Sequence, residues 1–165
     1  MLIRDAVDAD WAAVHPIFAS VVAEGTTYAY PTDLTSEQAR ALWMGQGHVV
    51  VAVDDDPARL GSVLGTATMG PNRPGRGAHV ATASFMVAEH ARGRGVGRAL
   101  GEHLVAWASA EGFRAVQFNA VVETNAAAVA LWRSLGFAVV GTVPEAFDHP
   151  TQGLVGLHVM HRFLP

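Results

Sequence analysis

The sequence predicts a single domain of the mixed α/β class, built on one mostly antiparallel sheet of six or seven strands with a central parallel pair. Three observations predict this class. The chain has 165 residues, half of them hydrophobic, which suits one domain with a full core. Apolar runs of strand length alternate with stretches of helical period. At 79–122, a strand, a glycine-rich loop, an amphipathic helix and another strand follow one another, and this order needs a crossover between parallel strands.

The first half of the chain contains both helix and strand signals. Asp8 and Asp10 are acidic residues of the kind that start a helix. Thr35 and Gln38 have the spacing of a capping box at the start of a second helix. In chain order, the expected elements are a strand at 2–5, a helix at 9–25, a helix at 36–44, strands at 48–53 and 62–69, and a loop rich in Gly, Pro and Asn at 70–77.

The second half contains the crossover and the closing strands. Between Val96 and Ala108, apolar residues recur on one helical face, which predicts an amphipathic helix that ends near Gly112. Gly136 marks the end of a later helix. In chain order, the expected elements are a strand at 79–87, a helix from 96 to 111, a strand at 115–122, a helix at 125–135, and strands at 137–143 and 154–163. Together these predict about four helices in one domain, residues 1–165.

Composition excludes several kinds of protein. The formal net charge is −4, which argues against broad electrostatic binding to nucleic acid. The chain has no cysteine, so disulfides, thiolate metal sites and a cysteine nucleophile are excluded. Its eight histidines show no spacing typical of a metal site. Because no signal-peptide core and no membrane-spanning apolar run is visible, we expect a cytoplasmic protein without a membrane partner.

The stretch ARGRGVGRAL, residues 91–100, places three glycines and three arginines between a strand and a helix. Glycines let several backbone N–H groups point the same way, and the start of a helix adds partial positive charge. The arginines would attract phosphate. The stretch therefore favours an anion-binding loop, with a plain strand-to-helix turn as the alternative. It lacks the Lys and Ser or Thr of a nucleoside triphosphate loop, and it lacks the third glycine of a dinucleotide-binding fingerprint.

Two motifs in register carry a family resemblance. Residues 92–97, RGRGVG, match a signature of Arg or Gln, two residues, Gly, one residue, and Gly or Ala. Residues 125–137 place an Asn at a helix start and an aromatic residue before a Gly-Phe pair. The chain thereby resembles the GCN5-related N-acetyltransferase (GNAT) superfamily over nearly its whole length. The resemblance implies a GNAT fold, in which the central parallel strands splay apart at a site for acetyl-CoA (coenzyme A).

The resemblance also implies which residues hold coenzyme A. The backbone of the glycine loop would bind the pyrophosphate, and the strand before it would pair with the pantetheine arm. A backbone N–H of that strand, at Phe85 or Met86, would polarise the thioester carbonyl. Asn125 would contact the pantetheine as well as cap its helix. The implied cofactor residues are Phe85, Met86, Val87, Arg92, Gly93, Arg94, Gly95, Val96, Gly97, Arg98 and Asn125.

A closer resemblance concerns the acceptor of the acetyl group. Four segments look like those of enzymes that acetylate azetidine-2-carboxylate, a proline analogue; they are GTTYAY at 25–30, GTATMGPN at 65–72, SFMV at 84–87 and QFNAVVETN at 117–125. One residue departs from the pattern, because Thr82 stands where the group has Asn. The implied partner is a small-molecule amine, for example an amino acid or a proline analogue.

Several polar residues are candidates to contact that acceptor. Asn119 lies in a predicted strand, where Asn is disfavoured, so its amide needs a partner. The resemblance makes it a substrate contact, with an outward, solvated side chain as the alternative. Tyr28 and Tyr30 would wall a pocket, although a connecting loop with its aromatic residues tucked into the core is the alternative. Asn72 and Arg73 would meet a substrate carboxylate, with an exposed turn as the alternative. Thr82 would orient the acceptor.

Acetyl transfer needs a base that takes a proton from the acceptor ammonium, because a free amine is scarce at pH 7. Glu123, His79 and Glu24 are the candidates, directly or through water, and spacing leaves the choice among them open. Many superfamily members have a Tyr acid where this chain has Trp132, and an indole N–H is not an acid of useful strength. Without cysteine, direct transfer from the thioester to the amine is the expected mechanism.

Two other functions compete with acetylation of a small amine. The Tyr absent at Trp132 favours a catalytically silent acyl-CoA-binding module. A protein N-terminus or a lysine is a rival acceptor. The closing strand at 154–163 is expected to pair across a two-fold axis, as happens in relatives, and this predicts a homodimer.

Overall fold

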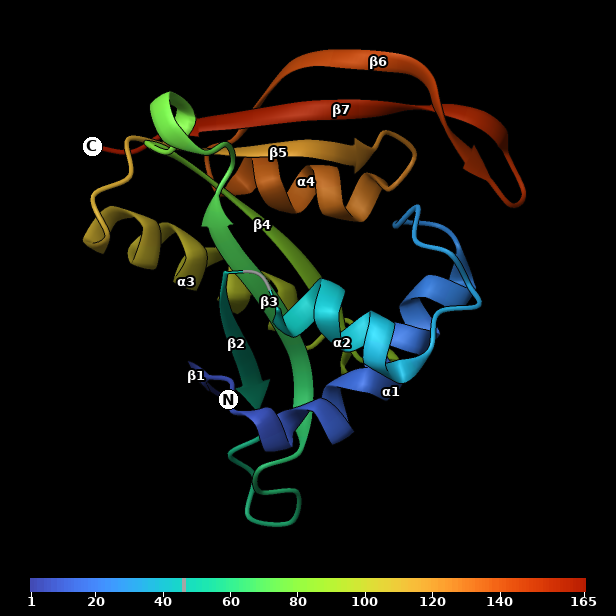
Figure 1. The fold of residues 1–165 in the computed structure, drawn as a ribbon, viewed down its shortest axis with the longest axis vertical. Coiled ribbons are helices and arrows are strands. Elements are labelled where there is room, and N and C mark those ends of the chain that lie inside the picture. The colour runs from blue at the N-terminus through green and yellow to red at the C-terminus, as the bar shows by residue number, and fades with distance from the viewer. Residues whose placement is uncertain (46) are drawn as a thin grey trace.

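The computed structural model describes residues 1–45 and 47–165 of the chain. Its centre is a seven-stranded sheet with the order β1-β2-β3-β4-β5-β7-β6 (Figure 1). Neighbouring strands are antiparallel except for β4 and β5, which are parallel. The predicted fold class is therefore confirmed. The strands are β1 (Leu2–Asp5), β2 (His48–Val53), β3 (Val63–Pro71), β4 (Val80–Val87), β5 (Ala115–Val122), β6 (Ala138–His149) and β7 (Gly153–Phe163).

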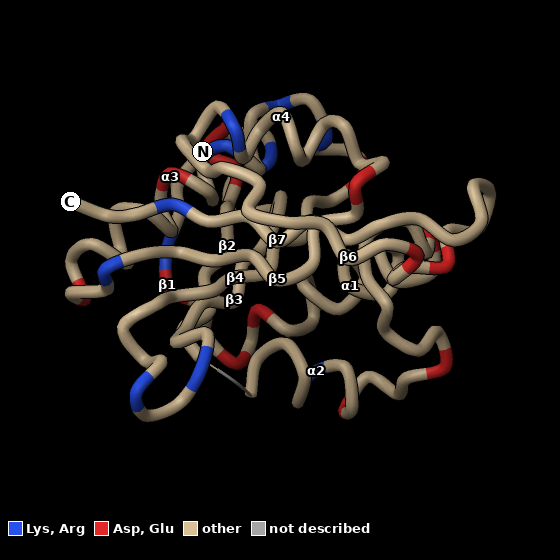
Figure 2. The backbone as a smooth tube through the Cα atoms, turned by 90° about the horizontal axis from the view of Figure 1, so that it is seen from above, with Lys and Arg blue, Asp and Glu red and all other residues tan. Residues whose placement is uncertain are grey.

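Helices cover both faces of this sheet (Figure 2). Trp43 of α2 donates to Thr66 on one face of β3, whereas a side chain at Gly65 would meet Val96 and Leu100 of α3 on the other face. Figures 1 and 2 show α1 beside α2 and α4 beside α3. No helix in the described part of the chain is long and apolar enough to cross a membrane. The helices are α1 (Trp11–Glu24), α2 (Ser36–Met44), α3 (Val96–Ala110) and α4 (Ala126–Ser134).

Three of the helix boundaries follow the local chemistry that the sequence predicts. Thr35 Oγ1 accepts from the N–H of Gln38 at 3.2 Å, and Gln38 Oε1 accepts from the N–H of Thr35 at 2.8 Å, which completes the capping box of α2. Gly112 and Gly136 follow α3 and α4 with φ of 80° and 83°. A left-handed glycine ends a helix without strain, so these two stops are confirmed.

The start of α1 differs from the expectation. The helix begins at Trp11, after a short 3-10 turn at Asp8–Asp10, and the Asp10 side chain makes no cap bond to it. Instead, Asp10 Oδ2 accepts from the N–H of Val7 at 2.8 Å and pairs with Arg4 at 2.7 Å. The hydrogen bond from Arg4 is the main reason that the pKa of Asp10 lies below its ordinary value. The acidic residue therefore fastens β1 to the turn before α1.

The last hairpin is longer than expected. The strand predicted at 137–143 continues as β6 to His149, past Pro144. Its pairing with β7 is irregular between Val143 and Phe147, and Glu145 there has a φ of 52°. A bulge of this kind lets a strand pass a proline and bend. The hairpin consequently reaches across the molecule toward the loop between α1 and α2 (Figure 1).

The parallel pair separates soon after it forms. β4 and β5 pair over two register positions only, starting at Val80 and Ala115, although the strands continue to Val87 and Val122. β5 also has an irregular stretch in its pairing with β7, and such bulges bend a strand. The outer half of β4 therefore has an open edge, as the GNAT resemblance implies.

Candidate active site

A cavity of about 890 Å³ opens where β4 and β5 diverge. Its walls come from both strands, the glycine loop, α4, the loop after α1 and the end of β6. Arg94, Asn72 and Glu123 do not line it. The structure brings together the remaining candidate site residues on its walls, namely Tyr28, Tyr30, Thr82, Phe85, Met86, Val87, Arg92, Gly93, Gly95, Val96, Gly97, Arg98, Asn119 and Asn125.

The hydroxyl of Tyr28 lies at the open edge of β4, against the backbone of Phe85. It accepts from the backbone N–H of Phe85 at 2.8 Å and donates to the Phe85 carbonyl at 2.7 Å. One hydroxyl therefore takes the place that a neighbouring strand would fill. Burial raises the pKa of Tyr28 well above its ordinary value, so the hydroxyl stays neutral and can accept and donate at once.

The hydrogen bond to Tyr28 shows which of the two expected backbone donors, Phe85 or Met86, faces the cavity. Successive residues of a strand direct their N–H groups to opposite sides. Because Phe85 faces the open edge, Met86 faces β3, where Thr66 is its register partner. Val87 again faces the open edge. Phe85 is thus the better placed donor of the expected pair, and it shares its N–H with Tyr28.

The glycine loop makes a tight turn between β4 and α3. Gly93 and Gly95 have φ of 76° and 81°, a conformation that side chains other than glycine rarely adopt. A Cβ on either residue would meet nothing within 4 Å, so open space adjoins the backbone there. Gly95 is the residue before α3, whose first N–H groups have no partner within the helix. A phosphate group fits this arrangement.

The three arginines of the loop have different partners. Arg92 forms an ion pair with Glu24 at the end of α1. Arg98 Nη2 donates to a hydroxyl of α4 at 2.8 Å. Arg94 instead pairs with Asp54 beyond the end of β2, with 3.0 Å between Nη2 and Oδ2. Arg92 and Arg98 therefore flank the cavity, whereas Arg94 fastens the loop from outside.

The surroundings of Asp54 stabilise its ion pair with Arg94. Its side chain is 3% exposed, and it accepts from the N–H of Asp56 at 3.1 Å and from Arg94. Arg59 approaches the same carboxylate at 3.4 Å. The hydrogen bond from Asp56, followed by that from Arg94, keeps the pKa of Asp54 below its ordinary value. Asp54 is therefore charged at neutral pH and anchors the loop.

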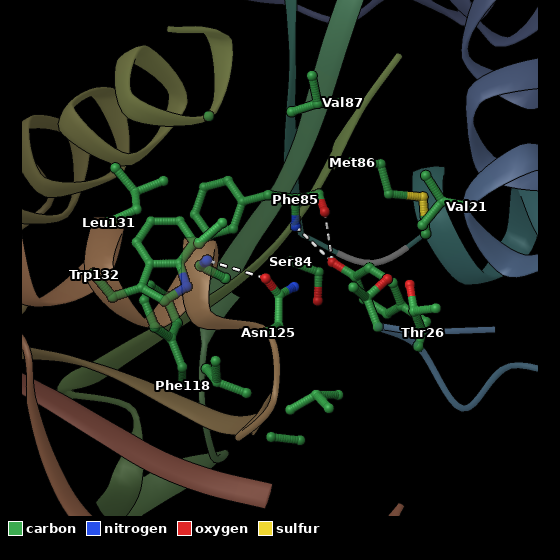
Figure 3. A pocket seen from close by; sticks show the side chains of 18 of the residues that line it. Val21, Thr26, Ser84, Phe85, Met86, Val87, Phe118, Asn125, Leu131 and Trp132 are labelled. Atoms are coloured by element: carbon green, nitrogen blue, oxygen red, sulfur yellow. Dashed lines mark hydrogen bonds between the residues drawn. The ribbon is translucent and has the colours of Figure 1, made fainter. Parts of the chain in front are cut away.

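The α4 side of the cavity combines an amide with an aromatic wall (Figure 3). Asn125 Oδ1 accepts from the N–H of Ala128 at 3.1 Å, which confirms the expected helix cap. Its amide group also lines the cavity. Trp132 packs against Phe85 and Phe118, with ring centres 4.8 and 4.7 Å apart. Trp132 thus contributes an apolar surface and no acid.

Asn119 has the polar partners that its place in a strand requires. Its Nδ2 donates to Asn72 Oδ1 at 2.6 Å, and its Oδ1 accepts from Gln117 Nε2 at 2.8 Å. Asn72 therefore contacts the cavity through Asn119. Thr82 lines the cavity from the face of β4 that also carries Met86, since side chains alternate along a strand.

The three candidate bases lie in different places. His79 is at the opposite end of β4, beside a separate cavity of about 560 Å³. Glu123 is exposed, and its Oε1 accepts from a backbone N–H of β7 at 2.5 Å. Glu24 alone of the three lines the main cavity, and it is paired with Arg92. Across residues 1–45 and 47–165, no group of three or more acidic or histidine side chains could hold a metal ion.

His149 is a site residue that the sequence does not reveal. It is 8% exposed, lines the cavity and lies at the end of β6. The predicted strand ended at residue 143, so no local signal placed His149 near the site. It arrives there because the β6–β7 turn folds back onto the loop after α1, where a Cβ on Gly25 would lie 3.8 Å from Pro150 Cγ.

The chain belongs to the acetyltransferase (GNAT) family, whose model matches residues 16–137. The splayed parallel pair, the glycine loop and the cavity between them agree with this membership. The family is one of acetyltransferases, as its name states. Two of the chain's curated relatives are larger proteins. N-acetyltransferase aca1 of Schizosaccharomyces pombe is 35% identical, and the chain covers 41% of its length. Protein SPT10 of Saccharomyces cerevisiae is 34% identical, and the chain covers 15% of its length.

A relative of similar length is the L-methionine sulfoximine/L-methionine sulfone acetyltransferase of Pseudomonas aeruginosa. It is 33% identical over 150 residues, which cover 87% of this chain and 83% of the relative. It belongs to the same class of enzyme, and its acceptors are amino-acid analogues, as its name states.

Solved structures match nearly the whole chain. A GCN5-related N-acetyltransferase from Kribbella flavida is 64% identical, with a TM-score of 0.93 over 99% of this chain and 97% of that one. A ribosomal-protein-alanine N-acetyltransferase from Brucella melitensis is 30% identical, with a TM-score of 0.85 over 99% and 100%. A phosphinothricin acetyltransferase from Sinorhizobium meliloti, in complex with acetyl-CoA, is 26% identical, with a TM-score of 0.85 over 99% and 88%.

Proposed function

We propose that this chain acetylates the amine of a small amino-acid-like molecule. The observation that carries the proposal is the continuity of the cavity, which the glycine loop lines at one end and Tyr28 and Tyr30 line at the other. A cavity wall that carries hydroxyl and amide groups suits a small polar molecule. The names of the Pseudomonas and Sinorhizobium enzymes, both of which refer to amino-acid analogues, support this class of acceptor.

The residues present fit acetyl-CoA. The backbone between Gly93 and Gly97, with the start of α3, offers N–H groups to a pyrophosphate, and Arg92 and Arg98 flank it. The open edge of β4 offers backbone groups to an extended arm. Asn125 lines the same path. When bound, acetyl-CoA supplies an acetyl thioester, and the chain supplies position, hydrogen bonds and a path for the proton.

The roles of the other residues follow from their places. We assign Phe85 N–H to polarise the reacting carbonyl, whose oxygen then takes the place of the Tyr28 hydroxyl that accepts from this N–H. Asn119 and Thr82 orient the acceptor. Glu123 acts as base through water, since its neighbours Val122 and Thr124 line the cavity and β7 holds its carboxylate in place. Direct transfer follows from the absence of cysteine.

The test is release of free thiol from acetyl-CoA with a panel of acceptors. The panel contains L-methionine sulfone, L-methionine sulfoximine, azetidine-2-carboxylate, a peptide with N-terminal alanine and a lysine peptide. Turnover with one of the first three acceptors, and slower turnover with the peptides, is expected. Turnover with a peptide alone would favour a protein acceptor. A rise in melting temperature with acetyl-CoA, without turnover on any amine, would favour a silent binding module.

We also propose that two copies pair through the last hairpin. Val140, Val143 and Leu154 of β6 and β7 are exposed by 63%, 51% and 61%. Exposed apolar side chains on the edge hairpin of a sheet favour association. Light scattering should report twice the chain mass of 17.4 kDa. A cytoplasmic location and the lack of nucleic-acid or membrane partners stay predictions.

A further inference from the structure

Apart from Arg92 and Arg98, the described residues that line the cavity include no Arg or Lys side chain. The charged residues on the described walls are Glu24, Arg92 and Arg98. Arg92 and Arg98 belong to the glycine loop, and Glu24 is paired with Arg92. An acidic acceptor therefore needs a different partner for its carboxylate, because a buried carboxylate without a hydrogen-bond donor is costly.

His149 has the properties of such a partner. Its Nδ1 accepts from the backbone N–H of Thr151 at 3.3 Å, with the Thr151 hydroxyl at 3.4 Å. A neutral imidazole whose Nδ1 accepts a hydrogen bond carries its proton on Nε2. A protonated imidazole also carries a proton there. The turn after β6 thus favours the tautomer in which Nε2 of His149 is the donor.

Nε2 of His149 is available to a ligand. Among the described residues it has no hydrogen-bond partner, and the one fully buried side-chain polar atom without a partner there is Nε2 of His103. Nε2 of His149 therefore keeps contact with solvent, and the residue lines the cavity while being 8% exposed overall. An unpartnered donor on a cavity wall is a place where a polar ligand group binds without displacing a protein contact.

The position of His149 assigns it to the acceptor. The hairpin that carries it packs near Gly25, at the start of the loop that bears Tyr28 and Tyr30. We infer that His149 is a specificity-determining residue whose Nε2–H donates to the carboxylate of an amino-acid acceptor. This inference rests on the proposed function and deepens it, since it names the group by which the enzyme selects amino acids over plain amines.

The experiment compares two acceptors in four proteins. The acceptors are L-methionine sulfone and the amine that lacks only its carboxyl group. The proteins are the wild type, His149→Phe, His149→Gln and the control His158→Phe, which alters a histidine of β7 that does not line the cavity. The quantity of interest is the ratio of kcat/KM for the amino acid to kcat/KM for the amine, because this ratio cancels general damage to the fold.

We expect the wild type to favour the amino acid by about tenfold or more, the usual effect of a hydrogen bond to a charged group. His149→Phe should bring the ratio close to one and leave the KM for acetyl-CoA unchanged. His149→Gln retains an N–H donor and should keep most of the preference, as should His158→Phe. Melting temperatures, with and without acetyl-CoA, check that each variant is folded.

The outcomes separate this inference from the proposed function. A wild-type ratio that His149→Phe leaves unchanged would overturn the role of His149 while leaving the small-amine function standing. A wild type without preference for the carboxylate would also overturn it. A wild type that acetylates peptides but neither small acceptor would overturn the proposed function, and the inference with it.

Discussion

Removing the Tyr28 hydroxyl tests how much its two hydrogen bonds stabilise the open edge of β4. In Tyr28→Phe, the hydroxyl that bridges the N–H and carbonyl of Phe85 is removed, while the ring and its packing remain. A hydrogen bond contributes about 0.5–1.5 kcal/mol net, and two are lost. The free energy of unfolding should therefore fall by about 2 kcal/mol, because two hydrogen bonds are lost and water from the cavity replaces them in part. For a chain of this length, this lowers the melting temperature by about 4–8 °C.

Tyr30 provides the matched control. Its ring stacks on that of Tyr28, with centres 5.5 Å apart and an interplanar angle of 5°, and on that of Phe18. Within the described residues, its hydroxyl has no hydrogen-bond partner. Tyr30→Phe should thus change the free energy of unfolding by less than about 0.5 kcal/mol. Urea unfolding of both variants is the measurement, and equal effects of the two substitutions would refute the role given to the Tyr28 hydroxyl.

Four further results are expected. Gly95→Ala and Gly112→Ala, at φ of 81° and 80°, should each destabilise the fold by about 1 kcal/mol, but only Gly95→Ala should weaken acetyl-CoA binding in calorimetry. Asp54→Asn should raise the KM for acetyl-CoA about threefold to tenfold without lowering kcat, because Arg94 no longer holds the loop as firmly. The pKa values of Asp10 and Asp54 lie below the ordinary carboxyl value. The stability that these two carboxylates contribute is therefore present above about pH 4 and is lost as the pH falls further. Urea unfolding midpoints measured from pH 6 to pH 3 should show this decline, and the decline should be smaller in Asp10→Asn. The raised pKa of the Tyr28 hydroxyl has the opposite sign: its stability is present below about pH 10 and is lost as the pH rises further, an alkaline decline that Tyr28→Phe should lessen.

The sequence predicted the fold well because the fold depends largely on local signals. Hydrophobic period separates helix from strand, and glycines such as Gly112 end helices through a property of a single residue. The capping box at Thr35 likewise involves residues three positions apart. The strand–loop–helix–strand order required a parallel pair before any contact was known. Where two local signals conflict, as at Pro144 within β6, the boundary was wrong, because pairing with β7 outweighs the proline.

Among the candidate site residues, those that belong to a sequence motif were the most predictable. The glycine loop and Asn125 could be named because backbone conformation and helix capping leave a mark on the sequence. The motif did not show that Arg94 turns to Asp54, since the partner comes from a different part of the chain, 40 residues away.

The sequence by itself therefore determined the family and the mixed, mostly antiparallel sheet with its central parallel pair. Only the tertiary structure decided the partners of Tyr28 and the place of His149 on the cavity wall. Tyr28 reaches a backbone 57 residues away, and His149 reaches the cavity through a hairpin that folds back onto the loop after α1. The physical reason is that a single hydroxyl or imidazole leaves no periodic pattern in the sequence. Its role depends on which surfaces the packed core brings together.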